Sequence, residues 1–75
     1  MSTIHRLTAL IEREGDSYVA LCPELDITSQ GDTVESALAN LKEALELFME
    51  SADPSEITDR LRGEVFITQL EVAVG

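Results

Sequence analysis

The chain has few of the residues from which small proteins build covalent or metal-bound support. Its 75 residues contain one cysteine, Cys22, and one histidine, His5. A single cysteine excludes an internal disulfide, and the two residues together are too few for a metal cage built on cysteine and histidine. A domain of this size buries only about 60% of the surface that its unfolded chain exposes. We therefore expect a homo-oligomer, a dimer or tetramer, to supply the missing support.

Basic residues are also scarce. Five lysines and arginines stand against fifteen aspartates and glutamates, which gives a formal net charge of −10. Direct binding of nucleic acid and of anionic membranes depends on lysine and arginine, so neither is expected. The charge permits a basic partner, including a protein that itself binds nucleic acid. It is equally compatible with a role in solubility alone.

Long apolar runs are absent as well. No stretch reaches the roughly 18 apolar residues of a membrane span, and the first residues lack the basic cluster and sustained apolar region of a signal peptide. The sequence therefore predicts a cytoplasmic protein. Hydrophobic residues still make up 44% of the chain, which is ordinary for a globular domain, so disorder is not expected.

Three short segments predict an antiparallel meander. The first two, residues 4–13 and 17–22, are joined by a tight turn at Gly15 and should pair antiparallel. Proline has no N–H for the sheet, so Pro23 ends the second segment, and residues 27–30 form the third. Along the first segment, three apolar residues share one face: Leu7, Ala9 and Ile11.

A helix is predicted to begin near Asp32 or Thr33, because either residue can cap it. Its apolar residues recur at intervals of three, four and seven, which places them on one stripe. That stripe predicts the main core, so aspartate at Leu38 or Leu41 should unfold the domain. A further helical turn is expected at residues 56–61. The stripe consists of Val34, Ala37, Leu38, Leu41, Leu45 and Phe48.

Residues 64–74 predict a last strand, because apolar residues alternate along them. The fold class is therefore α+β with the order β-β-β-α-β: an antiparallel three-stranded meander plus a fourth strand, and one main helix packed on one face. Residues 1–75 are expected to form a single domain. The open sheet face, bearing Val65 and Ile67, is expected to contact another subunit, as is Leu47 on the outer side of the helix.

No constellation in the sequence predicts catalysis or a cofactor. His5 has no nucleophile near it in sequence, and Cys22 has no cation nearby to lower its pKa, so a surface histidine and a structural thiol are expected. Glu24 and Asp26 flank Leu25, and paired carboxylates can serve acid–base chemistry or bind a hard cation. In a chain with fifteen acidic residues, a solvated or partner-facing loop is the preferred interpretation.

Acidic residues gather in the predicted meander and its turns, and we interpret them as a rim that contacts a basic partner. A metal-dependent nuclease would need carboxylates that converge from different strands and the helix. Glu12, Glu43 and Glu71 could be nominated for that role, but nothing in their spacing selects them, and we expect no metal site. The predicted partner-binding residues are Glu12, Asp16, Glu24, Asp26 and Asp32.

Residues 19–48, VALCPELDITSQGDTVESALANLKEALELF, resemble the HicB-like antitoxin family. Its members carry a strand that reads roughly Y-x-A-x-x-P-E-L, a small-polar strand ending in G-x-T, and a helix that starts with E-A and has a central N. Ser36 departs from the pattern, since an acidic residue is common there. The matching residues are Tyr18, Ala20, Pro23, Glu24, Leu25, Gly31, Thr33, Ala37 and Asn40.

The resemblance implies a partial RNase H-like fold without that enzyme's activity, and the role of antitoxin in a type II toxin–antitoxin pair. The partner would be a small, basic HicA-type toxin that cleaves mRNA, and the antitoxin would occlude its RNA surface or catalytic histidine. Many members carry a further C-terminal DNA-binding domain. This chain ends at Gly75 after its last predicted strand, so no separate DNA-binding domain is expected. The alternative is a stand-alone homo-oligomeric interaction module of unknown ligand.

Overall fold

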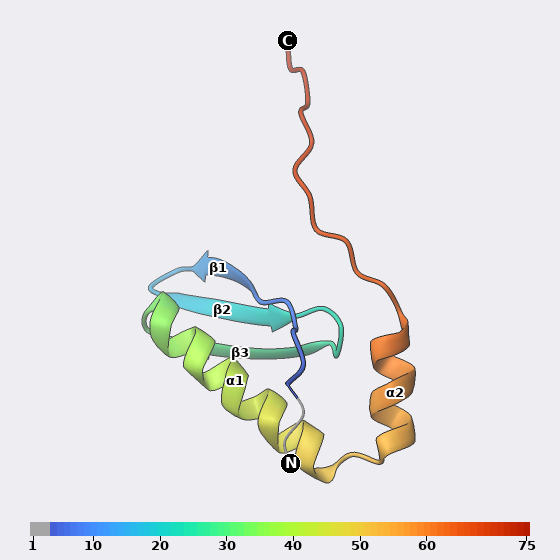
Figure 1. Cartoon of the computed structure of the whole chain (residues 1–75). Coiled ribbons are helices and arrows are strands. Elements are labelled where there is room, and N and C mark those ends of the chain that lie inside the picture. The colour runs from blue at the N-terminus through green and yellow to red at the C-terminus, as the bar shows by residue number, and fades with distance from the viewer. Residues whose placement is uncertain (1–3) are drawn as a thin grey trace.

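The computed structural model describes residues 4–75, and Figure 1 shows a small sheet with one long helix laid across it. The three strands are antiparallel and lie in the order β1-β2-β3. A second helix follows the long one. The elements are β1 (Leu10–Glu14), β2 (Ser17–Cys22), β3 (Ile27–Gly31), α1 (Val34–Ser51) and α2 (Pro54–Arg62).

The predicted meander is confirmed, with a shorter first strand. Gly15 lies in the β1–β2 turn at φ +63°, in the left-handed region that glycine enters without a Cβ penalty. Ile11 pairs with Ala20, which pairs in turn with Ser29 on β3. β1 begins at Leu10 instead of residue 4. Before it, the backbone N–H of Thr8 is donated to the Glu24 carboxylate and not to a neighbouring strand.

α1 begins with a capping box that uses Thr33. Its hydroxyl accepts the backbone N–H of Ser36 at 3.0 Å, and the Ser36 hydroxyl accepts the backbone N–H of Thr33 at 3.0 Å. Ser36 thus does locally what an acidic residue does in the usual form of the motif. The helix packs mainly on β3 and β2 and least on β1. The core beneath it consists of Ala20, Cys22, Leu25, Ala37 and Leu41.

The apolar stripe of α1 is broader than the surface it covers. Leu41 is 1% exposed, whereas Leu38 is 45% and Val34 39% exposed. The prediction that Leu38 belongs to the main core is therefore wrong. The helix crosses the sheet over β3 and β2, so the Leu38 side of the stripe lies toward β1, where there is least sheet to cover it.

α2 is longer than the single turn predicted at residues 56–61 and starts at Pro54, whose fixed φ suits the first helical position. Two of its side chains, Arg60 and Leu61, contact the rest of the fold. Arg60 Nη1 donates to the Leu25 carbonyl oxygen at 2.9 Å, and the guanidinium lies 5.1 Å from the centroid of the Phe48 ring. Leu61 packs against the core.

Residues 63–75 form no strand, so the predicted fourth strand at 64–74 is wrong for the single chain. They leave α2 as an extended segment that runs away from the sheet in Figure 1. Alternation along the sequence indicates an extended backbone, and the backbone is extended. A strand also needs a neighbour that accepts its N–H groups, and within residues 4–75 this segment has none.

Neither helix in the described part of the chain combines the length and the apolar character needed to cross a membrane.

Candidate functional site

The carboxylate of Glu24 is bound within the protein's own fold. Its two oxygens accept the backbone N–H of Thr8 at 3.1 and 3.0 Å, and the Thr8 hydroxyl donates to Oε2 at 2.6 Å. The Cys22 thiol lies 3.5 Å from Oε1. These contacts tie the segment before β1 to the β2–β3 turn. Glu24 was expected to face a partner, and its geometry gives it a role in the fold.

Two opposing effects act on the pKa of Glu24. Partial burial works to raise the pKa, but the hydrogen bonds donated by Thr8 and by nearby backbone N–H groups stabilise the charged form and outweigh it, so the pKa lies below its ordinary value. A folded-state pKa below the unfolded value contributes stability above the unfolded pKa. That stability is lost as the pH falls through the folded pKa.

We expect Glu24→Gln to lower the free energy of unfolding by about 1–3 kcal/mol at neutral pH, because Thr8 loses a charged acceptor. The loss should be smaller at a pH below the folded-state pKa of Glu24, because the wild-type side chain is then neutral like glutamine. Urea unfolding of both proteins at neutral pH and at that acidic pH measures the difference. Asp26→Asn is the matched control, since Asp26 is exposed in the same turn and should change stability by less than about 0.5 kcal/mol. An equal loss at both pH values would contradict the ionic role.

Cys22 is fully buried next to Glu24. Burial raises the pKa of the thiol, and the Glu24 carboxylate raises it further, although backbone N–H groups partly offset both effects. The thiolate, which is the reactive form, is therefore disfavoured. Cys22 is thus a buried thiol, as predicted for a structural cysteine.

The other motif residues also hold elements of the fold together. Asn40 on α1 donates through Nδ2 to the Gln30 carbonyl oxygen on β3 at 2.8 Å. Gly31 lies so close to the start of α1 that a Cβ would lie 2.5 Å from the backbone nitrogen of Ala37 and would also collide with the Ser36 hydroxyl. Asn40 and Gly31 thus help to specify how β3 meets α1.

The remaining predicted partner-binding acids are exposed but do not form one rim. Asp16 and Asp32 lie at the end of the sheet where the β1–β2 turn and the start of α1 meet, and Asp26 lies in the β2–β3 turn at the opposite end. Glu12 lies between the two ends, on the sheet face opposite α1, because it alternates with Ile11. Only Glu12 is therefore placed on the open face by the strand register, and the three aspartates lie at the two ends of the sheet.

These exposed acids form no ion pair in the described residues, although the guanidinium groups of Arg13 and Arg60 bind the carbonyl oxygens of Gly15 and Leu25 nearby. Ion pairs within residues 4–75 occur only inside α2, between Arg60 and Glu56 at 3.1 Å and between Arg62 and Asp59 at 3.7 Å. No group of three or more histidines, cysteines or carboxylates in this part of the chain is arranged to hold a metal ion. The surface can therefore offer carboxylates to basic groups on another molecule.

The open sheet face also has an apolar centre. Leu10 is paired with Leu21, and Glu12 with Val19. Leu10 is exposed, and Val19 and Leu21 are half-buried. An apolar centre bordered by charged residues is the usual anatomy of a protein-binding surface. We call this set the open-face surface: Leu10, Val19, Leu21 and Glu12 on the face, with Asp16, Asp26 and Asp32 at the ends of the sheet.

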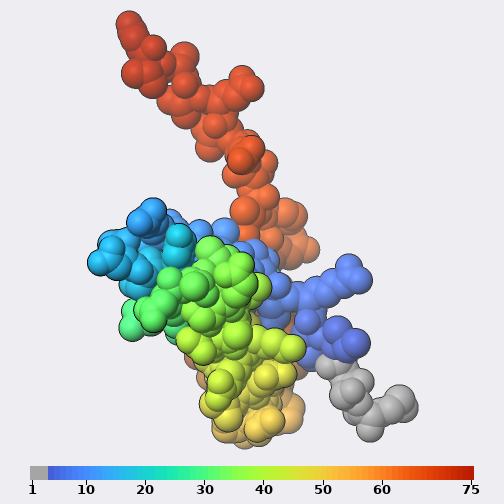
Figure 2. All heavy atoms as spheres, turned by 90° about the vertical axis from the view of Figure 1, so that its left-hand side faces the viewer, coloured from blue at the N-terminus to red at the C-terminus, as the bar shows by residue number. Residues whose placement is uncertain are grey.

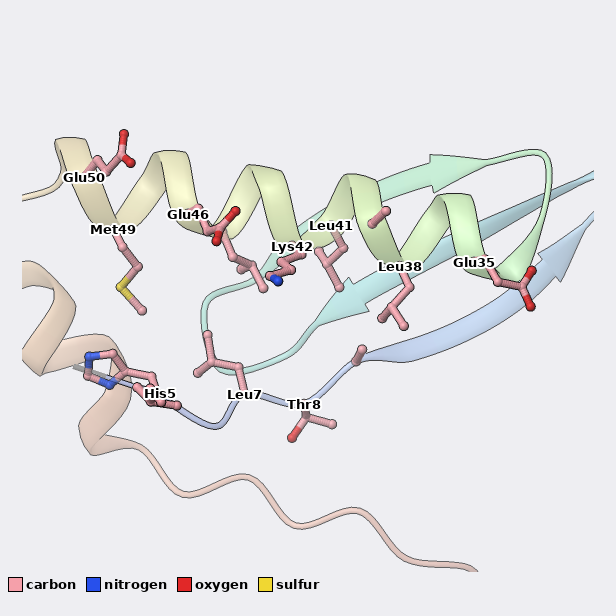
Figure 3. Close-up of a pocket in the computed structure, with 14 residues that line it drawn as sticks. His5, Leu7, Thr8, Glu35, Leu38, Leu41, Lys42, Glu46, Met49 and Glu50 are labelled. Atoms are coloured by element: carbon pink, nitrogen blue, oxygen red, sulfur yellow. The ribbon is translucent and has the colours of Figure 1, made fainter. Parts of the chain in front are cut away.

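A second surface feature is an apolar groove of about 1130 Å³ between α1 and the segment before β1. In Figure 3, Leu38, Leu41 and Met49 on α1 point toward Leu7 across it. The sequence reasoning missed this groove because it assigned the whole α1 stripe to the core. The available signal was an apolar stripe too wide for a helix that covers three short strands. Its remaining lining residues are Ile4, His5, Thr8, Ala9, Glu35, Ala39, Lys42, Leu45, Glu46 and Glu50.

The three residues predicted to contact another subunit lie in two places. Leu47 is 57% exposed on α1, on the side of the helix away from the groove-lining residues. Val65 and Ile67 lie in the extended segment after α2 and are also exposed. The structure therefore does not bring the three together on one chain.

These features define a small α+β domain, a three-stranded antiparallel meander with one long helix packed on one face and a second helix after it. Its sequence is 34% identical over 68 residues to a UPF0150 protein of Helicobacter pylori, and the alignment covers 89% of this chain and 94% of that protein. The chain belongs to the UPF0150 family.

Two further UPF0150 proteins, both from Synechocystis sp., match shorter segments. The protein ssr1765 is 50% identical over 50 residues, which are 64% of this chain and 63% of the relative. The protein ssl0738 is 48% identical over 46 residues, which are 59% of this chain and 64% of the relative. The chain thus spans less than two thirds of the length of each Synechocystis relative. No family model and no solved structure matches it.

Proposed function

We propose that this UPF0150 chain is a HicB-like antitoxin. It would bind a small, basic HicA-type toxin that cleaves mRNA and neutralise it without chemistry of its own. The observation that carries the proposal is the set of exposed carboxylates Glu12, Asp16, Asp26 and Asp32, which form no ion pair within residues 4–75, on a chain of net charge −10. The resemblance of residues 19–48 to HicB-like antitoxins supports it.

The mechanism is competition for one basic surface. A protein that binds RNA presents lysine and arginine to the phosphates. The carboxylates of the open-face surface can form ion pairs with those same lysines and arginines, while Leu10, Val19 and Leu21 supply the apolar contact. RNA is then excluded from the toxin. Because exposed charges steer the encounter, the association rate should fall as salt is raised.

Neutralising two of the bordering acids, Glu12→Gln with Asp26→Asn, should weaken toxin binding by about tenfold, roughly 1.4 kcal/mol. The matched control is Glu43→Gln with Glu50→Gln, which removes the same charge from exposed positions on α1. The measurement is the concentration of each variant that halves RNA cleavage by the purified toxin. Equal losses in the two pairs would show that only net charge matters, and no loss in either would contradict the site.

The alternative, a stand-alone homo-oligomeric module, is favoured by a different observation: the apolar side chains of residues 64–75 are exposed. The proteins that the full chain captures from its own cells distinguish the antitoxin from the stand-alone module. A small basic protein supports the antitoxin, and a complex made only of this chain supports the module. Self-association and toxin binding are also compatible, because they use different surfaces.

A further inference from the structure

The segment after α2, residues 64–75, has the apolar composition of a buried strand, but its side chains are exposed. Its apolar residues Phe66, Leu70, Val72 and Val74 lie on one side of an extended backbone and are between 72% and 95% exposed. Four large apolar side chains this close together are not expected to remain exposed to solvent. An extended segment with unpaired backbone groups also favours pairing with a sheet edge.

The segment is directed away from its own sheet. α2 is fixed by the bond from Arg60 to the Leu25 carbonyl oxygen and by the packing of Leu61. Gly63, which follows the helix, has φ −69° and ψ 135°, so it lacks the left-handed conformation that reverses the chain at many helix ends. In Figures 1 and 2 the segment projects from the body of the protein.

The overall dimensions agree with a domain that has one extended segment outside it. The radius of gyration is 14.7 Å, against about 11 Å for a compact chain of this length. The longest axis is 52 Å and the shortest is 18 Å. The projecting residues therefore lie well beyond the reach of the core that could cover them.

The same chain carries a site that fits such a strand. β1 is an edge strand with one neighbour, β2, so its other edge has backbone groups available for pairing. The apolar groove lies on the β1 side of α1, where Leu38 is 45% exposed. A strand added to β1 at the usual spacing of about 4.8 Å would lie in the groove and turn one face toward α1.

Apolar surface, and not charge, matches the two parts. The groove is lined by Lys42 and His5 but also by Glu35, Glu46 and Glu50, and residues 64–75 carry only the acidic Glu64 and Glu71. The groove and the segment therefore fit each other through exposed apolar side chains and unpaired backbone edges.

We propose that the occupant is a second copy of this chain. Residues 64–74 of one copy pair with the free edge of β1 in the other, and Phe66, Leu70 and Val72 cover the groove beside Leu38. The exchange is reciprocal, so two identical copies close two grooves around a two-fold axis. The fourth strand that the sequence predicts is then supplied by the partner copy.

Isotope-filtered NOE spectroscopy on an equal mixture of labelled and unlabelled full-length chain tests the proposal directly. We expect NOEs between the methyl groups of Leu38 in one copy and the Phe66 ring or Val72 methyls in the other. The same contacts confined to one chain would mean that the segment folds back on its own sheet, and would overturn the exchange. A segment without contacts would overturn it as well.

Three aspartate variants of the full chain give an independent test by light scattering after size exclusion. Phe66→Asp and Leu38→Asp should each shift the protein from dimer to monomer. Leu47→Asp, the control at a more exposed leucine outside the groove, should remain dimeric. A wild-type monomer, or a dimer that is lost only in Leu47→Asp, would contradict the proposal. Circular dichroism confirms that each variant is folded.

Discussion

Leu41→Asp is expected to unfold the protein, whereas Leu38→Asp is expected to leave the domain folded. Leu41 is 1% exposed and packs in the core with Leu25 and Cys22, while Leu38 is 45% exposed. A carboxylate forced into that core would have no partner and would cost several kcal/mol. One core in a chain this small rarely supplies more than about 3–5 kcal/mol, so the change at Leu41 removes essentially all of the stability.

Far-UV circular dichroism and urea unfolding of the two variants separate these outcomes. Leu41→Asp should lack the helical signal without denaturant, and Leu38→Asp should retain it with a cooperative transition. The sequence alone predicts unfolding for both changes, so the pair tests the placement of α1 on the sheet. A folded Leu41→Asp variant, or a Leu38→Asp variant without helix, would mean that α1 is rotated relative to the described packing.

Gly31→Ala should lower the free energy of unfolding by about 1–3 kcal/mol, the range typical of overpacking. The added Cβ would lie 2.5 Å from the backbone nitrogen of Ala37 and would collide with Ser36. Backbone atoms at the start of a helix cannot move aside without disturbing the cap at Thr33. The change should therefore separate β3 from α1.

Gly15→Ala is the control for Gly31→Ala in thermal or urea unfolding. A Cβ at Gly15 meets nothing within 4 Å, but its φ of +63° is one that other residues rarely adopt. The expected cost is about 1–2 kcal/mol and comes from the backbone alone. The helical signal should survive fully in the Gly15 variant. A Gly31 variant as stable as the wild type would contradict the close approach of β3 and α1.

Local signals were sufficient for the meander and the long helix. Gly15, Pro23 and Gly31 separate the three strands, and the capping residues Asp32 and Thr33 with the period of the apolar residues indicate where α1 begins. Each of these signals acts within a few residues of the structure it determines. They were correct because turn geometry, capping and periodicity agree with the packing here.

The errors arose where the outcome depends on distant contacts. Leu38 has the same periodicity as Leu41, and only the line along which α1 crosses the sheet decides which of the two is buried. Residues 64–74 have the pattern of a strand, but pairing depends on a neighbour that the pattern does not specify. In each case the local conformation was predictable and the contact was not.

The candidate site shows the same division. The exposure of Asp26, Glu12, Asp16 and Asp32 follows from their place in turns and on the polar side of a strand. Glu24 has the same chemistry and a neighbouring position, yet it is bonded to Thr8, sixteen residues earlier. No sequence spacing indicates that contact. The acidic composition predicted a surface for a basic partner, and the packing decides which acids remain available to it.

The most direct test of the proposed function is inhibition of RNA cleavage by the small basic protein that co-purifies with this chain from its own cells. The proposal predicts that an equimolar amount of the purified chain abolishes cleavage, and that inhibition weakens as the salt concentration is raised. Recovery of the chain with no protein but itself, or a co-purified protein whose RNA cleavage continues at saturating concentrations of the chain, would contradict the antitoxin function.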